Sequence, residues 1–174
     1  MQFSKLPIAA VLALAAAFVH AAPPETYPGL VVSKVVPMGE YTLTYWSDAP
    51  GTIAGDALGA RAPIPCSGNN DVTCSGSHKA ESGICNQLVN SLHSNSGTVI
   101  GDSPRSICLG QGGNQCCVSW SAAVGSLPQG DLFDAAKKIF SSCFGATISG
   151  LARNVNLNGG CVTECLSNRP TGCS

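Results

Sequence analysis

Charged and aromatic side chains are scarce in this sequence. Of its 174 residues, 11% are charged and 6% are aromatic, and the formal net charge is −1. From Ala62 to the end, six basic residues balance six acidic ones, so no basic patch is present. The sequence therefore offers no cluster of basic side chains that could contact nucleic-acid phosphates, and we expect no nucleic-acid partner. Trp46 and Trp120 are the only tryptophans, so few aromatic rings are present that could form a sugar-binding platform.

The sequence also lacks a hydrophobic run long enough to span a bilayer. The run from Leu6 to Val19 has roughly fourteen residues, where ~20 are needed. It follows the polar start Met1 and Lys5 and ends in small residues, which is the pattern of a secretion signal. We therefore predict a signal peptide at residues 1–21, cleavage after Ala21, and a secreted, extracellular protein without a membrane span.

No Cys-x-x-Cys pair occurs, and beyond the signal only His78 and His93 offer imidazole ligands. These absences argue against zinc, the competing interpretation of a cysteine-rich chain, and we expect no metal and no cofactor. An even, dense set of ten cysteines is typical of disulfides in a small secreted domain. We predict about five disulfides among Cys66, Cys74, Cys85, Cys108, Cys116, Cys117, Cys143, Cys161, Cys165 and Cys173.

Residues 22–65 differ in composition from the rest, because they hold many prolines and no cysteine. Within them, Glu40 to Trp46 has the alternation and the β-branched and aromatic content of one strand. A lone strand cannot bury itself. Either it pairs with the edge of the following domain, or the segment is a pro-region or flexible N-terminal arm that is removed or left mobile. Both interpretations stay open, and we place the disulfide-rich domain at residues 66–174.

Two amphipathic helices and several short strands are predicted in this domain. The first helix starts at the N-cap Ser77 and carries Cys85 on its buried face, and the second runs from the N-cap Asp131 to Cys143. Strands are expected at Thr98–Ile100, Ser106–Leu109 and Cys116–Trp120, and at an exposed edge around Val155. These elements predict an α+β fold, a two-layer α/β sandwich with a small antiparallel sheet and two helices.

Adjacent cysteines at Cys116 and Cys117 cannot easily bond to each other, because consecutive Cα atoms lie only about 3.8 Å apart. In a strand their side chains point to opposite faces. We predict that this strand is central, bridged to the helix layer on one side and to a loop or tail on the other. We also expect Cys85 and Cys143 to pair with cysteines of the sheet, and Cys173 to close back on the Cys66–Cys74 end.

The residue types of a catalytic triad gather in one short stretch. Ser77, His78 and Glu81 supply a nucleophile, a base and an acid within five positions. On a helix, however, Ser77 and Glu81 share a face and His78 points away from both, so no triad geometry follows.

Paired carboxylates would be needed for a glycosidase. Asp131 and Asp134 are better explained by helix capping, and Asp102 by its turn. The glycines of Gly110–Gly113 precede a strand, so they predict a hairpin loop and no phosphate-binding loop. We therefore expect no enzymatic activity, and a hydrolase built on Glu81, Asp102 or His78 is the alternative.

Several blocks of the sequence resemble a family of small secreted fungal proteins, the fungal WD-like domain family. The blocks are Cys74–His78, Cys85–Leu88, Cys116–Trp120, the helix from Asp131 to Cys143, and Cys165–Pro170 with Cys173. The order of cysteines, helices and strands is more loosely similar to secreted necrosis-inducing factors of plant-pathogenic fungi and to smut-fungus killer toxins. That similarity implies an α/β sandwich without enzymatic activity.

From the secretion signal, the cysteines and this resemblance we predict a non-enzymatic fungal protein, effector-like or toxin-like, that acts on a host or a competing microbe. The alternative is a structural or carbohydrate-binding protein of the fungal cell wall or matrix. Because fixed scaffolds present recognition on loops, we expect the binding surface at Gly110 to Gln115, Asn154 to Asn158 and Arg169. We expect a monomer.

Overall fold

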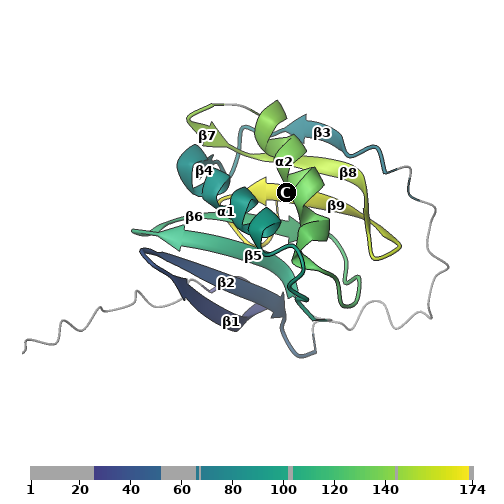
Figure 1. The fold of residues 1–174 in the computed structure, drawn as a ribbon, viewed down its shortest axis with the longest axis horizontal. Helices are drawn as coiled ribbons and strands as arrows, with labels where there is room; N and C mark the ends of the chain where they lie inside the picture. Colours follow the sequence, from purple (N-terminus) through teal and green to yellow (C-terminus); the bar gives the residue numbers. More distant parts are fainter. Residues whose placement is uncertain (1–25, 52–65, 67, 102–103, 144, 173–174) are drawn as a thin grey trace, which may run out of the picture.

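The computed structural model describes residues 26–51, 66, 68–101, 104–143 and 145–172 (Figure 1). The predicted signal peptide lies outside the described residues. The described elements, in chain order, are β1 (Leu30–Met38), β2 (Tyr41–Asp48), β3 (Asp71–Cys74), β4 (Ala80–Glu81), α1 (Ser82–Ser94), β5 (Pro104–Gln111), β6 (Asn114–Trp120), the 3-10 turn η1 (Gln129–Leu132), α2 (Phe133–Ser142), β7 (Thr147–Ile148), β8 (Gly150–Leu157) and β9 (Gly160–Ser167).

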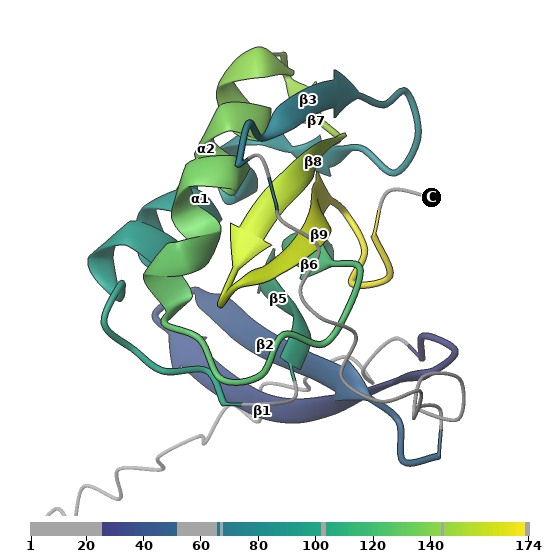
Figure 2. The same ribbon diagram turned by 90° about the vertical axis from the view of Figure 1, so that its right-hand side faces the viewer.

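A seven-stranded antiparallel sheet forms the body of the molecule, with the strand order β1-β2-β5-β6-β9-β8-β3. Both helices pack on the same face of this sheet, α1 over β5 and β6 and α2 over β8 and β9 (Figure 2). The main hydrophobic core lies between them. We call the opposite face, which includes Trp46, Cys108 and Cys117, the helix-free face.

Successive side chains of a strand point to opposite faces of the sheet, so a single strand contributes residues to both faces. In β6, Cys116, Val118 and Trp120 point into the main core, whereas Cys117 packs with Trp46 on the helix-free face. Two hairpins turn on residue pairs with positive φ, namely Gly112-Gly113 between β5 and β6 and Asn158-Gly159 between β8 and β9. Such pairs suit the tight turns whose twist matches that of the flanking strands.

The predicted two-layer α/β sandwich with a small sheet is wrong. The structure is mostly antiparallel sheet, with two short helices. The prediction undercounted strands at both ends of the chain, because it assigned one strand to residues 22–65 and none to the segment around Cys161 and Cys165. Instead β1 and β2 extend one side of the sheet, and β9 lies in its interior between β6 and β8.

Local boundaries also differ from the prediction. The first helix begins at Ser82 rather than after Ser77, because His78 adopts a left-handed φ of 53° and the chain forms the short strand β4 before the helix. The second helix begins at Phe133, and Asp131 lies in the preceding 3-10 turn.

Residues 98–100 supply only an isolated bridge from Val99 to Pro128. The strand around Val155 is internal, since β8 lies between β9 and β3.

Four disulfides are present among the described residues, not five. They join Cys66 to Cys161, Cys74 to Cys143, Cys85 to Cys116, and Cys108 to Cys117. Cys165 is buried, and Cys173 lies outside the described residues.

The disulfides confirm that Cys116 and Cys117 are bonded on opposite faces. Cys116 reaches α1 through Cys85, and Cys117 bonds Cys108 on the neighbouring strand β5 rather than a loop or tail. The pairing of Cys85 and Cys143 with strand cysteines is also confirmed. Cys66 and Cys74, the end on which Cys173 was expected to close, bond Cys161 and Cys143, and Cys173 itself lies outside the described residues.

The N-terminal strands are integral to the described sheet. The predicted strand at Glu40–Trp46 is present as β2, and it pairs with β5 from Thr42 to Ser47. Leu43 and Tyr45 enter the main core, while Trp46 covers the Cys108–Cys117 disulfide. Removal of this segment by processing stays a prediction.

No helix in the part of the chain that the structure describes is long and apolar enough to cross a membrane.

Candidate functional site

A groove of about 790 Å³ opens on the helix-free face, above β2, β5 and β6. One cross-strand row of its lining consists of Thr42, Gly110 and Gln115, which lie opposite one another in the sheet. Thr44 and Trp46 extend the lining along β2, because residues two apart on a strand share a face. The groove therefore has hydroxyl, amide and bare backbone groups on its floor.

The walls of the groove come from four separate parts of the chain. They are Val32 and Val35 of β1, the β5–β6 turn at Gln111–Asn114, the segment His78–Glu81, and Asn168–Arg169 after β9. The backbone N–H of Asn168 donates to the carbonyl of His78 at 2.9 Å, which ties two of these walls together.

Gly110 leaves the groove open at its centre. A Cβ placed on it would lie 3.6 Å from the Asn114 carbonyl oxygen, 3.9 Å from the Thr42 carbonyl oxygen and 4.0 Å from the Gln115 Cβ. These are ordinary van der Waals distances, so the backbone accepts a side chain here. A larger side chain would fill the groove.

Trp46 closes one end of the groove, and its indole N–H makes no hydrogen bond to a described residue. Trp46 is only 5% exposed, and its ring meets the Tyr27 ring edge-on at 5.2 Å between centroids. Gln115 Nε2 donates to the Tyr27 hydroxyl at 2.7 Å, so this end of the groove is held in place.

The formal charges of the residues that line the groove cancel. Glu40 and Glu81 are acidic, and Lys79 and Arg169 are basic. None of the four forms an ion pair with another described residue. Arg169 is positioned through its Nε, which donates to the Gly172 carbonyl at 2.8 Å. The groove thus carries no net charge of its own, and a ligand need not be an ion.

The predicted site residues are only partly brought together. Residues 110–115 and Arg169 meet in the groove, as do His78 and Glu81 from the hydrolase alternative. Asp102 lies outside the described residues, Asp131 lies in η1 and Asp134 at the start of α2, and neither of these two lines the groove.

The asparagines at positions 154, 156 and 158, in β8 and in the turn after it, form hydrogen bonds within the fold instead. Asn154 Nδ2 donates to Asp71 at 3.0 Å, Asn156 accepts from the Gly159 N–H, and Asn158 Nδ2 donates to the Val124 carbonyl. None of them lines the groove, so this part of the predicted binding surface lies outside it and stays a prediction.

Sequence reasoning missed the contribution of β1 and β2 to the groove. The signal was present in β2, where Thr42, Thr44 and Trp46 alternate with the core residues Leu43 and Tyr45. When every second residue of a strand is buried and the residues between them are polar or aromatic, the latter point to the opposite face of the sheet and can line a binding site there.

The described residues contain no group of three or more His, Cys, Asp or Glu side chains arranged to hold a metal ion.

Comparisons with known proteins give one positive result. No curated protein and no solved structure matches the chain. The model of the family described as Fungal WD-like matches residues 63–173, which is more than half of the chain, and the protein therefore belongs to the fungal WD-like family.

Proposed function

We propose that this small cysteine-rich fungal protein is secreted and acts without catalysis, as an effector-like or toxin-like protein that binds a host or microbial target in the groove of its helix-free face. The observation that carries the proposal is the groove itself. Its floor row of Thr42, Gly110 and Gln115 is walled by segments that are far apart in sequence, so the fold, rather than one loop, builds it.

Secretion is supported by the signal pattern at residues 1–21 and by four disulfides in one small domain. Such a density of disulfides is typical of oxidising, extracellular environments. The toxin-like part of the proposal rests on the order of cysteines, helices and strands alone.

A role without catalysis fits the geometry around His78. A catalytic nucleophile and base must lie within hydrogen-bonding reach of each other. Among the described residues, no hydrogen bond joins His78 to Ser77 or Glu81. The backbone amide of Ser77 donates to the Ser75 hydroxyl at 3.1 Å, and His78 contributes its carbonyl to the fold.

The alternative function is carbohydrate binding in the fungal wall or matrix. It is favoured by the hydroxyl and amide groups on the groove floor and by the balance of charges on its walls. Trp46 weighs against it, because its ring is too buried to form an exposed stacking platform for sugars.

The test uses the purified, disulfide-bonded protein and two variants at one position. Gly110→Trp fills the groove, and Gly110→Ala adds a single methyl group with ordinary contacts. Wild type and Gly110→Ala should provoke a response when applied to host leaves or rival fungi, and Gly110→Trp should not. No response from the wild type, together with no bound partner, would refute the proposal.

A pull-down with insoluble polysaccharides separates the two functions. Retention of wild type on fungal-wall glucan or chitin, lost in Gly110→Trp, would favour the carbohydrate-binding alternative. Cleavage of the polysaccharide that Glu81→Gln abolishes would contradict a non-enzymatic role.

A further inference from the structure

A second hollow, of about 560 Å³, lies at the other end of the helix-free face. We call it the tail cleft. It is bounded by the start of β1 at Pro28–Leu30 and by residues 170–172 after β9, and its floor includes Ser119 of β6 and Leu151 of β8. It shares no lining residue with the groove. The apolar cluster of Tyr27, Leu30, Val32 and Trp46 over the Cys108–Cys117 disulfide separates the two.

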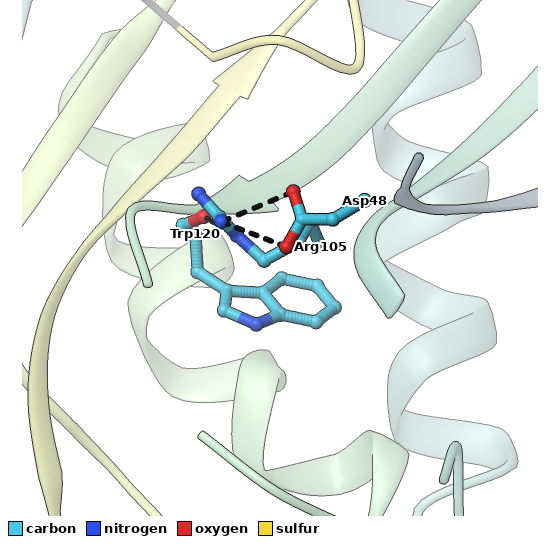
Figure 3. A network of polar contacts seen from close by, with 3 residues as sticks. All are labelled: Asp48, Arg105 and Trp120. Carbon is cyan, nitrogen blue, oxygen red and sulfur yellow. Dashed lines mark hydrogen bonds and ion pairs between the residues drawn. The ribbon is translucent and has the colours of Figure 1, made fainter. Parts of the chain in front are cut away.

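Asp48 and Arg105, which both line the tail cleft, form an ion pair with each other (Figure 3). Arg105 Nη1 contacts both carboxylate oxygens of Asp48, at 3.2 and 3.3 Å, and Arg105 Nε donates to the Trp120 carbonyl at 3.0 Å. The side chains of Arg105 and Asp48 are 25% and 23% exposed, so the ion pair is accessible to a molecule in the cleft. Asp48 neutralises the charge of Arg105, and Arg105 Nη2 has no partner among the described residues.

Ser119 adds a buried hydroxyl without a partner. The residue is 4% exposed, and its Oγ makes no hydrogen bond to any described residue. A Cβ placed on Gly172 would lie 3.6 Å from this Oγ, so the hydroxyl lies next to the segment that bounds the cleft. Buried polar atoms in folded proteins are nearly always satisfied, by protein, water or ligand.

Apolar residues, Leu30, Leu151 and Pro170 among them, form more than half of the lining, which also includes Ser121, Thr163 and Thr171. Clefts of roughly 300–1,000 Å³ with apolar walls and a few convergent polar groups are the common form of small-molecule sites. The tail cleft meets both conditions. Because its ion pair is internally neutralised, a charged ligand would gain little there and would lose hydration.

We propose that the tail cleft binds a small, uncharged, mostly apolar molecule that carries a hydroxyl or carbonyl group, with Ser119 and Arg105 as its polar contacts. The site is independent of the groove and of the function proposed for it. It requires both the family-matched region, which holds Ser119 and Leu151, and the N-terminal segment, which holds Leu30 and Asp48.

The experiment is an NMR titration of the isotope-labelled, disulfide-bonded full chain with 1-octanol as the uncharged probe and octanoate as the anionic one. We expect saturable shifts of the Ser119, Leu151 and Gly172 amides with 1-octanol, and binding at least tenfold weaker with octanoate. Equal or tighter binding of octanoate would overturn the assignment of an uncharged ligand, and shifts that do not saturate would overturn the site.

Two variants that reduce the cleft make the test specific. Leu151→Trp and Thr171→Trp each place a larger side chain in the cleft, and Thr171 is exposed, so its replacement leaves the core intact. Both should weaken 1-octanol binding at least tenfold. Val35→Trp is the matched control, since Val35 lines the groove and is 55% exposed. Unchanged affinity in Thr171→Trp, or equal loss in Val35→Trp, would overturn the proposal.

Discussion

The carboxyl group of Glu164 should make the folded protein less stable as the pH rises. Glu164 lies on β9 opposite Trp120, is 0% exposed, and neither of its carboxylate oxygens has a hydrogen-bond partner among the described residues. Burial raises the pKa of Glu164 well above its ordinary value; the backbone of Ala136 acts against this rise, and the nearby Asp134 charge adds to it. Burial in the folded protein therefore favours the neutral, protonated form of Glu164 over the ionised form.

The size of the effect follows from the proton balance between the two states. In the unfolded chain this carboxyl titrates near its ordinary pKa of about 4.3. Above that pH the folded protein keeps a proton that the unfolded chain has lost. The free energy of unfolding then falls by about 1.4 kcal/mol per pH unit until the pKa of the folded state is reached.

Glu164→Gln tests this reasoning, because glutamine has nearly the same shape and does not ionise. Urea unfolding, followed by tryptophan fluorescence with the disulfides intact, should give similar stabilities for variant and wild type at about pH 4, with the variant gaining by about 1.4 kcal/mol per unit as the pH rises. Glu81→Gln is the control, since Glu81 is exposed. Parallel pH profiles for wild type and Glu164→Gln would refute the reasoning.

Three further predictions concern stability and are measured by urea unfolding. Trp46→Ala should destabilise the protein by about 3–5 kcal/mol, because it empties the cluster over the Cys108–Cys117 disulfide; a loss below about 1 kcal/mol would show that β2 is not integral to the fold. A double-mutant cycle of Asp48→Ala and Arg105→Ala should give a coupling of only about 0.2–1 kcal/mol, since the pair is partly exposed; a coupling of several kcal/mol would contradict this. Gly159→Ala should cost about 1–2 kcal/mol because φ is 79° at the β8–β9 turn, and a stabilised variant would contradict that turn.

Much of the centre of the fold was predictable from local chemistry. Adjacent cysteines in a strand must face opposite ways, and Cys116 and Cys117 are bonded on opposite faces as expected. The partner of Cys117 was not predictable, because the choice between a neighbouring strand and a tail depends on register. Cys108 lies directly opposite Cys117 only because the Gly112-Gly113 turn sets that register.

The ends of the sheet were harder to predict. β1 is an edge strand whose side chains are mostly exposed, and Lys34 and Pro37 break the alternation that marks a half-buried strand. β9 could have been found, because Asn158-Gly159 between two alternating runs is a strong hairpin signal. The groove needed the structure, since Gly110 lies on β5 and His78 lies outside the large sheet, held to Asn168 after β9 by a backbone hydrogen bond, so only the tertiary fold brings the two together.

The central claim is that the groove of the helix-free face is the recognition site. The most direct measurement is saturable binding of labelled wild type, Gly110→Ala and Gly110→Trp to intact host cells and to hyphae of rival fungi, with the unfolding stability of all three measured alongside. The claim predicts binding by wild type and Gly110→Ala, and at least a tenfold loss in an equally stable Gly110→Trp. Equal binding by all three proteins would contradict it.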